Sequence, residues 1–227
     1  MINKFLTFSR RRRSSFETIK YLRSKGVKIG ESCYIRSDTH IDLTRPSLLE
    51  IGNGVRFGPK FTVYTHDFAS TVFLQKNKEF INSSGRVKIG NNVYFGINCT
   101  VLKGVTIGDN VIVGAGSIVV GDIPSNSVAS GVPAKVVCSL DDYYAKRKEK
   151  SLQEAFDYAR SIQERYGRKP VEADFFEEFP FFVNGNEIDK YPTIPIERQL
   201  GNALPEWKKN HKAMFDSFED FLKAAGI

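Results

Sequence analysis

The sequence predicts a mainly β protein: a parallel β-coil with a short helix before it and a mostly helical extension after it. Aliphatic or aromatic residues recur every six positions from Ile89 to Val119, and a second small or aliphatic residue stands two positions before each. A period of six fits neither an α-helix nor a lone strand. It does fit a solenoid with flat faces, in which each face turns one such residue inward. Glycine follows four of the six residues, where the chain has to turn a corner.

The repeat predicts that this coil covers residues 27–137, with one long interruption. Earlier blocks keep the same spacing, and their inward positions are Ile29, Ile35, Ile41, Ile51, Phe57 and Val63. Residues 64–86 do not fit the period, and a long excursion from a regular solenoid is commonly a functional loop. Pro124 removes a ladder donor, so we expect coiling to stop or loosen there. We expect Gly131–Lys135 to follow as an extended or turn segment.

Residues 1–26 are predicted to form a basic N-terminal arm and a capping helix. Ser14 and Ser15 are suitable N-caps for a helix over Phe16–Ser24, which Gly26 would end. A helix at this place would cover the open end of the solenoid, where strand edges are otherwise unpaired.

Residues 138–227 are predicted to form a separate helical and aromatic extension. Ser139 can cap a helix that starts near Leu140 and stops before Gly167. A second helix is expected over Pro205–Ala225, with irregular chain over residues 168–204 between the two. One short stretch is crowded with aromatic residues, which either pack the extension together or stack on sugar rings. These residues are Phe175, Phe176, Phe179, Phe181, Phe182 and Tyr191.

Composition points to a soluble globular protein of a reducing compartment. The chain has 227 residues, of which 41% are hydrophobic and 26% charged. No run approaches the roughly 20 apolar residues that span a bilayer, and the start is too short and polar for a signal peptide. Cys33 and Cys99 fall on small inward positions of the repeat, as core cysteines do. We therefore expect a cytoplasmic protein that can also visit the inner face of a membrane.

The net charge of +7 is concentrated at the N-terminus. Residues 1–28 hold nine basic residues, including the run Arg10–Arg13, against Glu17 alone. The arm is either solvated and packed on the first coil, or it contacts phosphates of a membrane or of a phosphate-bearing substrate. No recognised nucleic-acid module accompanies the charge, which argues against a nucleic-acid partner.

His66 is the best catalytic candidate in the sequence. It lies in the segment that breaks the repeat, between Thr65 and Asp67. A neutral imidazole is the usual general base near neutral pH, since the ordinary pKa of histidine is about 6.5. A loop histidine followed by an acid is by itself a weak signal, so the surrounding repeat has to carry the argument.

At this point the sequence resembles the hexapeptide-repeat acyltransferases, most closely the galactoside and maltose O-acetyltransferase branch and its relatives in polysaccharide biosynthesis. Four stretches carry the resemblance: VKIGNNVYFG from Val87, VLKGVTIG from Val101, VGAGSIVVGDI from Val113 and ASGVPAKV from Ala129. It covers residues 27–137, about half of the chain, and leaves the N-terminal arm and the long extension unexplained.

The resemblance implies a left-handed parallel β-helix, although crossovers are right-handed in most folds. It further implies a homotrimer that binds acetyl-CoA and a carbohydrate acceptor between subunits, and no metal. His66 matches the catalytic histidine of the family. It would remove the proton from an acceptor hydroxyl, which then attacks the thioester directly.

The resemblance also suggests a cofactor site, matched residue by residue. Lys135 stands where the family places a basic residue against the adenosine phosphate, and the alternative is a solvated lysine. Gly121 is a departure, because sugar-specific relatives often carry a lysine there. The other residues that would contact acetyl-CoA are Tyr94, Gly96, Ile97, Gly114, Ala115 and Val120.

Asp38 and His40 are candidates for binding the acceptor. They fall where galactoside-acetylating relatives hold the acceptor with polar residues. By the repeat, Thr39 and Ile41 point inward, so His40 points outward, either into the cleft near His66 or simply to solvent.

Rival functions differ in how well the residues fit them. A γ-type carbonic anhydrase shares the coil but needs three zinc-binding histidines, and only His40 and His66 lie in this coil. A purely structural solenoid needs neither the His66 segment nor the Gly131–Lys135 motif. Serine-acetylating relatives carry a helical domain before the coil, not after it. An N-acyltransferase acting on an amino sugar fits as well as an O-acetyltransferase, because the same base serves an amine.

Overall fold

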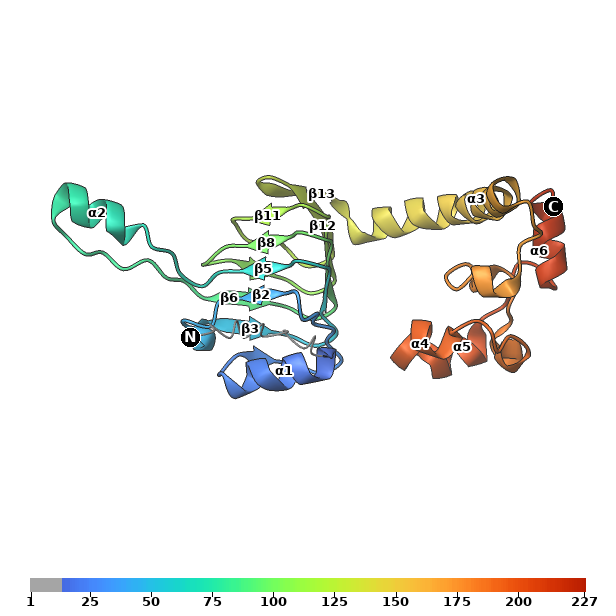
Figure 1. The fold of residues 1–227 in the computed structure, drawn as a ribbon, viewed down its shortest axis with the longest axis horizontal. Coiled ribbons are helices and arrows are strands. Elements are labelled where there is room, and N and C mark those ends of the chain that lie inside the picture. Colours follow the sequence, from blue (N-terminus) through green and yellow to red (C-terminus); the bar gives the residue numbers. More distant parts are fainter. Residues whose placement is uncertain (1–13) are drawn as a thin grey trace, which may run out of the picture. The chain divides into compact units, whose positions relative to one another are not determined.

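The computed structural model describes residues 14–227, so the Arg10–Arg13 run lies outside the described residues. The chain divides into two compact units: the first ends at Tyr144, and the second spans Ala145–Ile227. The first contains a stack of short strands, and the second contains only helices and turns (Figure 1).

Three sheets of short strands form the first unit, and from β3 to β11 the chain visits the three sheets in succession, one strand in each per turn. The first sheet contains β1 (Lys28–Ile29), β3 (Leu49–Ile51), β6 (Val87–Ile89) and β9 (Thr106–Ile107). The second contains β4 (Arg56–Phe57), β7 (Val93–Phe95), β10 (Val111–Val113), β12 (Ser127–Gly131) and β13 (Ala134–Ser139). The third contains β2 (His40–Ile41), β5 (Thr62–Val63), β8 (Thr100–Val101) and β11 (Ile118–Val119). Every strand pairing is parallel except that of β12 with β13.

The hydrophobic core of this unit is made of the predicted inward positions, stacked in register. On the third sheet, Val63 pairs with Ile41 on one side and Val101 on the other. On the second sheet, Phe57 and Phe95 lie with ring centroids 5.3 Å apart and nearly parallel rings. All of these side chains are buried, so the period of six is confirmed as the inward period of a parallel β-helix.

The corners of the coil depend on residues that tolerate unusual backbone. Asn92, Asn110 and Asn126 adopt positive φ, which asparagine accepts more readily than most residues. Their side-chain amides form a ladder from coil to coil, each bond 2.9 Å long. A Cβ on Gly52 would lie 2.5 Å from the carbonyl oxygen of Gly90 on the next coil, so glycine is required there by close approach.

The predicted capping helix is present as α1 (Ser15–Ser24). Ser14 is its N-cap and forms a capping box with Glu17, which satisfies two amide donors that the helix leaves unpaired. Leu22 is 5% exposed and belongs to the core of the β-helix. The helix therefore covers the first coil, as expected.

The end of the coil differs from the prediction. The parallel sheet does not stop at Pro124, because β12 pairs with β10 in register from Ser127 to Ala129. The chain then turns at Val132–Pro133 and returns antiparallel as β13. The Gly131–Lys135 segment therefore contains the turn of a hairpin and the first paired residues on either side of it. Pro124 lies before the strand rather than in it, and therefore costs no ladder hydrogen bond.

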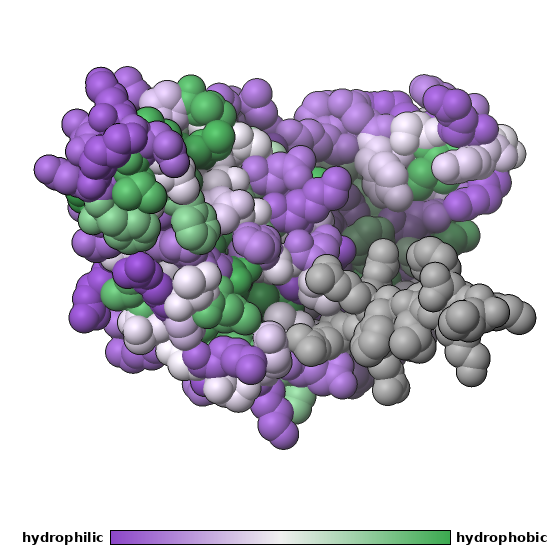
Figure 2. Space-filling view, turned by 60° about the vertical axis from the view of Figure 1, so that its left-hand side comes forward, coloured by the Kyte–Doolittle hydropathy of each residue, from purple (hydrophilic) through white to green (hydrophobic). Residues whose placement is uncertain are grey.

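The interruption of the repeat is an arm that leaves the coil after β5 and returns at β6. It contains α2 (Ser70–Asn77), which lies away from the coil in Figure 1. Large apolar side chains of the arm are solvent-exposed in the single chain, namely Phe68, Val72, Phe73, Leu74, Phe80 and Ile81. The space-filling view shows apolar patches between hydrophilic side chains on the face it presents (Figure 2).

The second unit is built around a cluster of aromatic rings. The helix α3 (Leu140–Tyr166) begins with the predicted Ser139 cap, whose hydroxyl accepts from the Asp142 amide at 3.0 Å. From α3, Ala155, Ala159 and Ile162 pack in the same cluster as Phe175, Phe182 and Phe221, all fully buried. Most of the crowded aromatic residues therefore pack the unit, whereas Phe176 is 45% exposed.

The prediction of a single helix over Pro205–Ala225 is wrong. The structure has two short helices, α5 (Leu204–Asn210) and α6 (Phe218–Ala224). The chain is extended at His211, whose Nε2 donates to the carbonyl of Pro180 at 2.8 Å, and Ser217 caps α6. The long-range bond of His211 and the local cap of Ser217 together compete successfully with a continuous helix.

The segment between α3 and α5 is more ordered than the expected irregular chain. It consists of short helical turns: η2 (Glu172–Asp174), η3 (Phe179–Phe181), η4 (Gly185–Lys190), α4 (Ile196–Leu200) and η5 (Gly201–Ala203). The first unit contains a further three-residue turn, η1 (Pro46–Leu48). No helix within residues 14–227 is long and apolar enough to cross a membrane.

Candidate active site

A pocket of about 450 Å³ lies where the arm leaves the coil. The loop after β2 supplies one side of it, and the segment after β5 supplies the other. It is lined by His40, Ile41, Asp42, Leu43, Thr44, Tyr64 and His66. The pocket therefore brings His66 and His40 together, as the sequence suggested.

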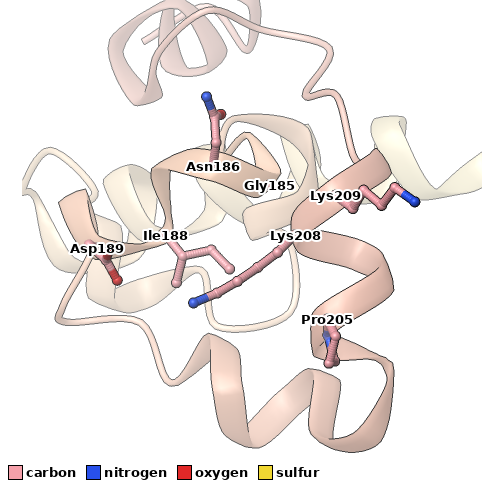
Figure 3. A pocket seen from close by; sticks show the side chains of 7 residues that line it. All are labelled: Gly185, Asn186, Ile188, Asp189, Pro205, Lys208 and Lys209. Carbon is pink, nitrogen blue, oxygen red and sulfur yellow. The ribbon is translucent and has the colours of Figure 1, made fainter.

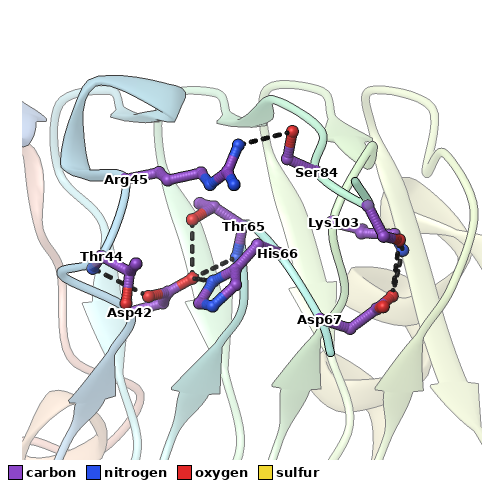
Figure 4. Close-up of polar contacts among 9 residues, drawn as sticks. Asp42, Thr44, Arg45, Thr65, His66, Asp67, Ser84 and Lys103 are labelled. Atoms are coloured by element: carbon purple, nitrogen blue, oxygen red, sulfur yellow. Dashed lines mark hydrogen bonds and ion pairs between the residues drawn. The ribbon is translucent and has the colours of Figure 1, made fainter. Parts of the chain in front are cut away.

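His66 is held by a carboxylate from the neighbouring coil. Its Nδ1 lies 2.6 Å from Oδ2 of Asp42, and the two side chains are 12% and 5% exposed. The register explains the contact, because β2 pairs with β5 and the residues just after these strands lie side by side. Figure 4 shows the imidazole directed at the carboxylate.

Asp42 is buried and fully bonded. Its Oδ2 accepts from the amide and the hydroxyl of Thr65 at 3.0 and 2.7 Å, and its Oδ1 accepts from the Thr44 amide at 2.9 Å. Burial alone would raise the pKa of Asp42, but these hydrogen bonds and that of His66 together hold it well below its ordinary value. Asp42 is therefore ionised and can only accept hydrogen bonds.

The charge of Asp42 fixes the tautomer of His66. A carboxylate without a proton accepts, so Nδ1 of His66 must carry a hydrogen and donate it. Nε2 is then left with its lone pair available for a proton. Phe68 packs edge-on against the imidazole at 5.2 Å between ring centroids, which limits rotation of the ring.

Asp67, the neighbour of His66 in sequence, has a different task. Its carboxylate binds Lys103 and Ser83, and the Lys103 ammonium is the main reason that the pKa of Asp67 falls to about 2. The amide of Asp67 also donates to the carbonyl of Ser83 at 3.1 Å. These contacts fasten the two ends of the arm to each other and to the next coil.

The two predicted acceptor-binding residues are placed differently. His40 lines the pocket and points outward, with its ring 5.6 Å from that of Tyr64. Asp38 is not among the lining residues, and its carboxylate is bound to Arg36 at 3.0 Å. Tyr64 is 40% exposed and offers an aromatic face that the sequence did not single out.

The residues predicted to contact acetyl-CoA line up along the coil but do not enter this pocket. The carbonyl of Ile97 accepts from Gly116 at 2.8 Å, and a Cβ on Gly114 would lie 2.9 Å from that of Ser130. Ser130 in turn pairs with Lys135. Ile97 and Ala115 lie exposed at the corner between the second and third sheets, and Tyr94 and Lys135 lie exposed on β7 and β13 of the second sheet.

Val120 and Gly121 lie on the opposite edge of the third sheet. They follow β11, as Tyr64 follows β5, so they share an edge with the pocket. Val120 is 51% exposed, and a Cβ on Gly121 would meet nothing within 4 Å. In one chain the predicted cofactor residues therefore flank the third sheet on both edges and do not converge with His66.

Asp42 is the residue that the sequence argument missed, although a signal existed. After the inward positions of the third sheet stand Tyr64, Leu102 and Val120, all apolar or aromatic, and in the first coil Asp42 occupies the same place. An acidic residue at a position that is apolar or aromatic in the other coils indicates a specific role for its side chain.

A second pocket, of about 390 Å³, lies in the C-terminal unit. Gly185, Asn186, Ile188 and Asp189 line it from one side and Pro205, Lys208 and Lys209 from the other (Figure 3). It contains no imidazole, thiol or hydroxyl side chain and no buried carboxylate. The pocket beside His66 is therefore the better candidate for chemistry.

Comparison with known proteins identifies the family. The family model for bacterial transferase hexapeptide (six repeats) matches residues 86–121. Protein CapG of Staphylococcus aureus is 38% identical over 151 residues, which are 66% of this chain and 83% of that protein. The chain belongs to the hexapeptide-repeat transferase family. The predicted fold class, the left-handed parallel β-helix with helical additions, is confirmed.

Galactoside O-acetyltransferases match a smaller part of the chain. The Escherichia coli (strain K12) protein is 37% identical over 124 residues, 53% of this chain and 59% of that protein. The Lactococcus lactis protein is 36% identical over 118 residues. The chain thus spans somewhat more than half the length of these relatives.

Solved structures give a looser likeness. A galactoside acetyltransferase in complex with coenzyme A is 27% identical, with a TM-score of 0.42 and coverage of 56% of this chain and 72% of that chain. A hexapeptide-repeat acetyltransferase of Vibrio cholerae complexed with acetyl coenzyme A is also 27% identical, with a TM-score of 0.44 and coverage of 51% and 61%.

Proposed function

We propose that this protein is an acetyl-CoA-dependent O-acetyltransferase that acts on a hydroxyl of a sugar or polysaccharide precursor. The observation that carries the proposal is the buried pair of His66 and Asp42 in a pocket that also offers the Tyr64 ring. Relatives of the same family named galactoside O-acetyltransferases support the choice of substrate class.

The geometry suits general base catalysis. With Nδ1 donating to Asp42, Nε2 of His66 accepts the proton of the acceptor hydroxyl, whose oxygen attacks the thioester carbonyl. The acetyl group moves to the sugar oxygen, the carbon–sulfur bond breaks, and the proton held on the imidazole passes to the departing thiolate. Asp42 stabilises the imidazolium that forms between these steps. An aromatic face such as Tyr64 is a good platform for the apolar face of a sugar ring.

We further propose that the working enzyme is a homotrimer with acetyl-CoA bound between subunits. The outward residues of the first sheet include Lys28 and Glu50, which form an ion pair, and Lys88. Elsewhere on the coil, Tyr34, Tyr94, Ile97 and Val120 are about half exposed. Large apolar residues left exposed in this way are typical of a surface that a partner covers. Light scattering on the purified protein measures the mass of the assembly, which should be that of three chains.

A single experiment tests the catalytic proposal. Release of CoA from acetyl-CoA is measured with neutral sugars, amino sugars and nucleotide sugars, for the wild type and His66→Ala side by side. We expect turnover with a hydroxyl acceptor and a loss of about 10²- to 10⁴-fold in the variant, with an unchanged fold by circular dichroism. Turnover with amino sugars alone would assign an N-acyltransferase instead. Absence of both turnover and CoA binding would leave a non-catalytic solenoid.

A further inference from the structure

One cationic side chain, that of Arg45, lies next in sequence to the pocket and takes no part in the His66–Asp42 pair. Arg45 follows Thr44, which lines the pocket and donates its amide to Asp42. The arginine side chain crosses to the other side of the site, where its Nη1 donates to the hydroxyl of Ser84 at 3.1 Å. Figure 4 shows it on the same side of the coil as Asp42, Thr65 and His66.

Arg45 is tied to both halves of the catalytic pair. On one side, it lies three residues after Asp42 in a loop that the Asp42 carboxylate itself holds. On the other, Ser84 forms an antiparallel bridge with His66 across the base of the arm. Both links place Arg45 beside the His66–Asp42 pair, although its side chain is exposed to solvent and is not among those that line the pocket.

No carboxylate among the described residues is paired with Arg45. Its one hydrogen bond within residues 14–227 is to the neutral hydroxyl of Ser84. The acids nearby are already engaged: Asp42 by His66 and Thr65, and Asp67 by Lys103. A guanidinium has five donors, so most of those of Arg45 remain available.

We propose that Arg45 selects an acceptor that carries an anionic oxygen group close to the hydroxyl being acetylated. This inference rests on the proposed function of the same pocket. A planar guanidinium binds carboxylate and phosphate oxygens in pairs, and it does so better when one of its own donors is already anchored. The group is either the carboxylate of an acidic sugar or the phosphate of a carrier-linked sugar, since both present two such oxygens.

The test compares matched acceptors on matched variants. The acceptors are a neutral hexose methyl glycoside, the corresponding hexuronic acid and the hexose 1-phosphate. The variants are Arg45→Gln and, as a control with the same loss of charge, Arg86→Gln, an exposed arginine where the arm rejoins the coil before β6. The quantity is the ratio of kcat/KM for each anionic acceptor to that for the neutral one.

We expect the wild type to prefer one of the anionic acceptors, and the better of the two identifies carboxylate or phosphate. Arg45→Gln should lower this ratio about tenfold or more, as expected for losing a charged hydrogen bond, and Arg86→Gln should change it less than threefold. An equal effect of both variants would overturn the inference, because it would show only long-range attraction. So would a ratio unchanged in Arg45→Gln, or an effect on the KM for acetyl-CoA alone.

Failure of the inference and failure of the proposed function remain distinguishable. If the wild type acetylates acceptors but Arg45→Gln keeps the ratio, the function stands and the role of Arg45 falls. If no acceptor is acetylated, calorimetric titration of wild type and Arg45→Gln with the uronic acid and the sugar phosphate still tests whether Arg45 binds an anionic group. Tighter binding to the wild type would support the anion site, and equal binding would overturn it. Arg45→Lys, which keeps the charge, serves if Arg45→Gln does not fold.

Discussion

The two units of this chain are stabilised in different ways. In the β-helix, small and aliphatic side chains stack in register, and backbones approach so closely that a Cβ on Gly52 would lie 2.5 Å from the next coil. In the C-terminal unit, short helical turns are held by interlocking aromatic rings around Phe221, which contacts Phe175, Phe182 and Phe218 among others. The stability of the β-helix depends on the regular spacing of its inward residues, and that of the C-terminal unit depends on a few large aromatic side chains. Their sensitivity to mutation should differ accordingly.

The largest effect is expected in the aromatic cluster. Phe221→Ala removes a fully buried ring and should lower the free energy of unfolding of the C-terminal unit by about 3–5 kcal/mol. Calorimetry should show this unit melting earlier, while the transition of the β-helix stays in place. Phe176→Ala, at a half-exposed position of the same unit, is the control and should cost far less. Equal shifts of both units would contradict the independence of the two cores.

The next effect concerns the catalytic pair. Asp42→Asn keeps the shape but removes the charge that fixes the tautomer of His66, so kcat should fall by roughly 10²-fold or more. Asp67→Asn removes a neighbouring carboxylate that binds Lys103 and not the imidazole, and its loss of kcat should be much smaller. Equal losses in the two variants would show that Asp42 has no special relation to His66.

The unfolding free energies of the wild type and of Asp42→Asn should depend differently on pH. The pKa of Asp42 is lower in the folded state than its ordinary value, so its ionisation stabilises the fold above the unfolded pKa of about 3.9. This contribution is lost as the pH falls through the folded pKa. The difference in unfolding free energy between wild type and Asp42→Asn should therefore be constant above about pH 5 and shrink in stronger acid. A difference that grows on acidification would contradict the assignment.

A smaller effect tests the backbone contacts of the coil. Gly52→Ala places a methyl group against the Gly90 carbonyl and should cost about 1–3 kcal/mol in urea unfolding. Gly121→Ala is the matched control, because its Cβ would meet nothing within 4 Å and its φ is not positive. We expect the unfolding free energy of Gly121→Ala to stay within about 0.5 kcal/mol of the wild type.

The smallest effect concerns the cofactor. Lys135 is exposed, so loss of a phosphate contact in Lys135→Ala should raise the KM for acetyl-CoA only about three- to tenfold, with kcat little changed. Lys88→Ala, on the charged face of the first sheet, is the control. A KM that moves equally in both variants, or in neither, would remove Lys135 from the site.

Much of the first unit could be predicted because one physical rule repeats. A period of six identifies the inward residues, and Ser14 with Glu17 identifies the helix that covers the first coil. His66 could be found because it interrupts that rule. Asp42 could not be paired with it from spacing alone, since the contact depends on the register between β2 and β5 across a coil of irregular length.

The second unit was less predictable because no period governs it. Over Pro205–Ala225 the apolar spacing fits one helix, yet His211 bonds to Pro180 and Ser217 starts a new helix. The first of these contacts joins residues 31 positions apart in sequence, and single-helix periodicity carries no information about such contacts.

The arm between β5 and β6 has a consequence for how this fold can change. Val63 pairs with Val101 as Val101 pairs with Val119, so the coil is in register whether or not a segment is inserted between them. Doubling the length of a flexible loop costs only about 0.6 kcal/mol of closure entropy, and Lys103 holds the base of the arm from outside it. The part of the arm beyond its base can therefore vary in length while the coil and the base of the arm, which includes His66, stay in place.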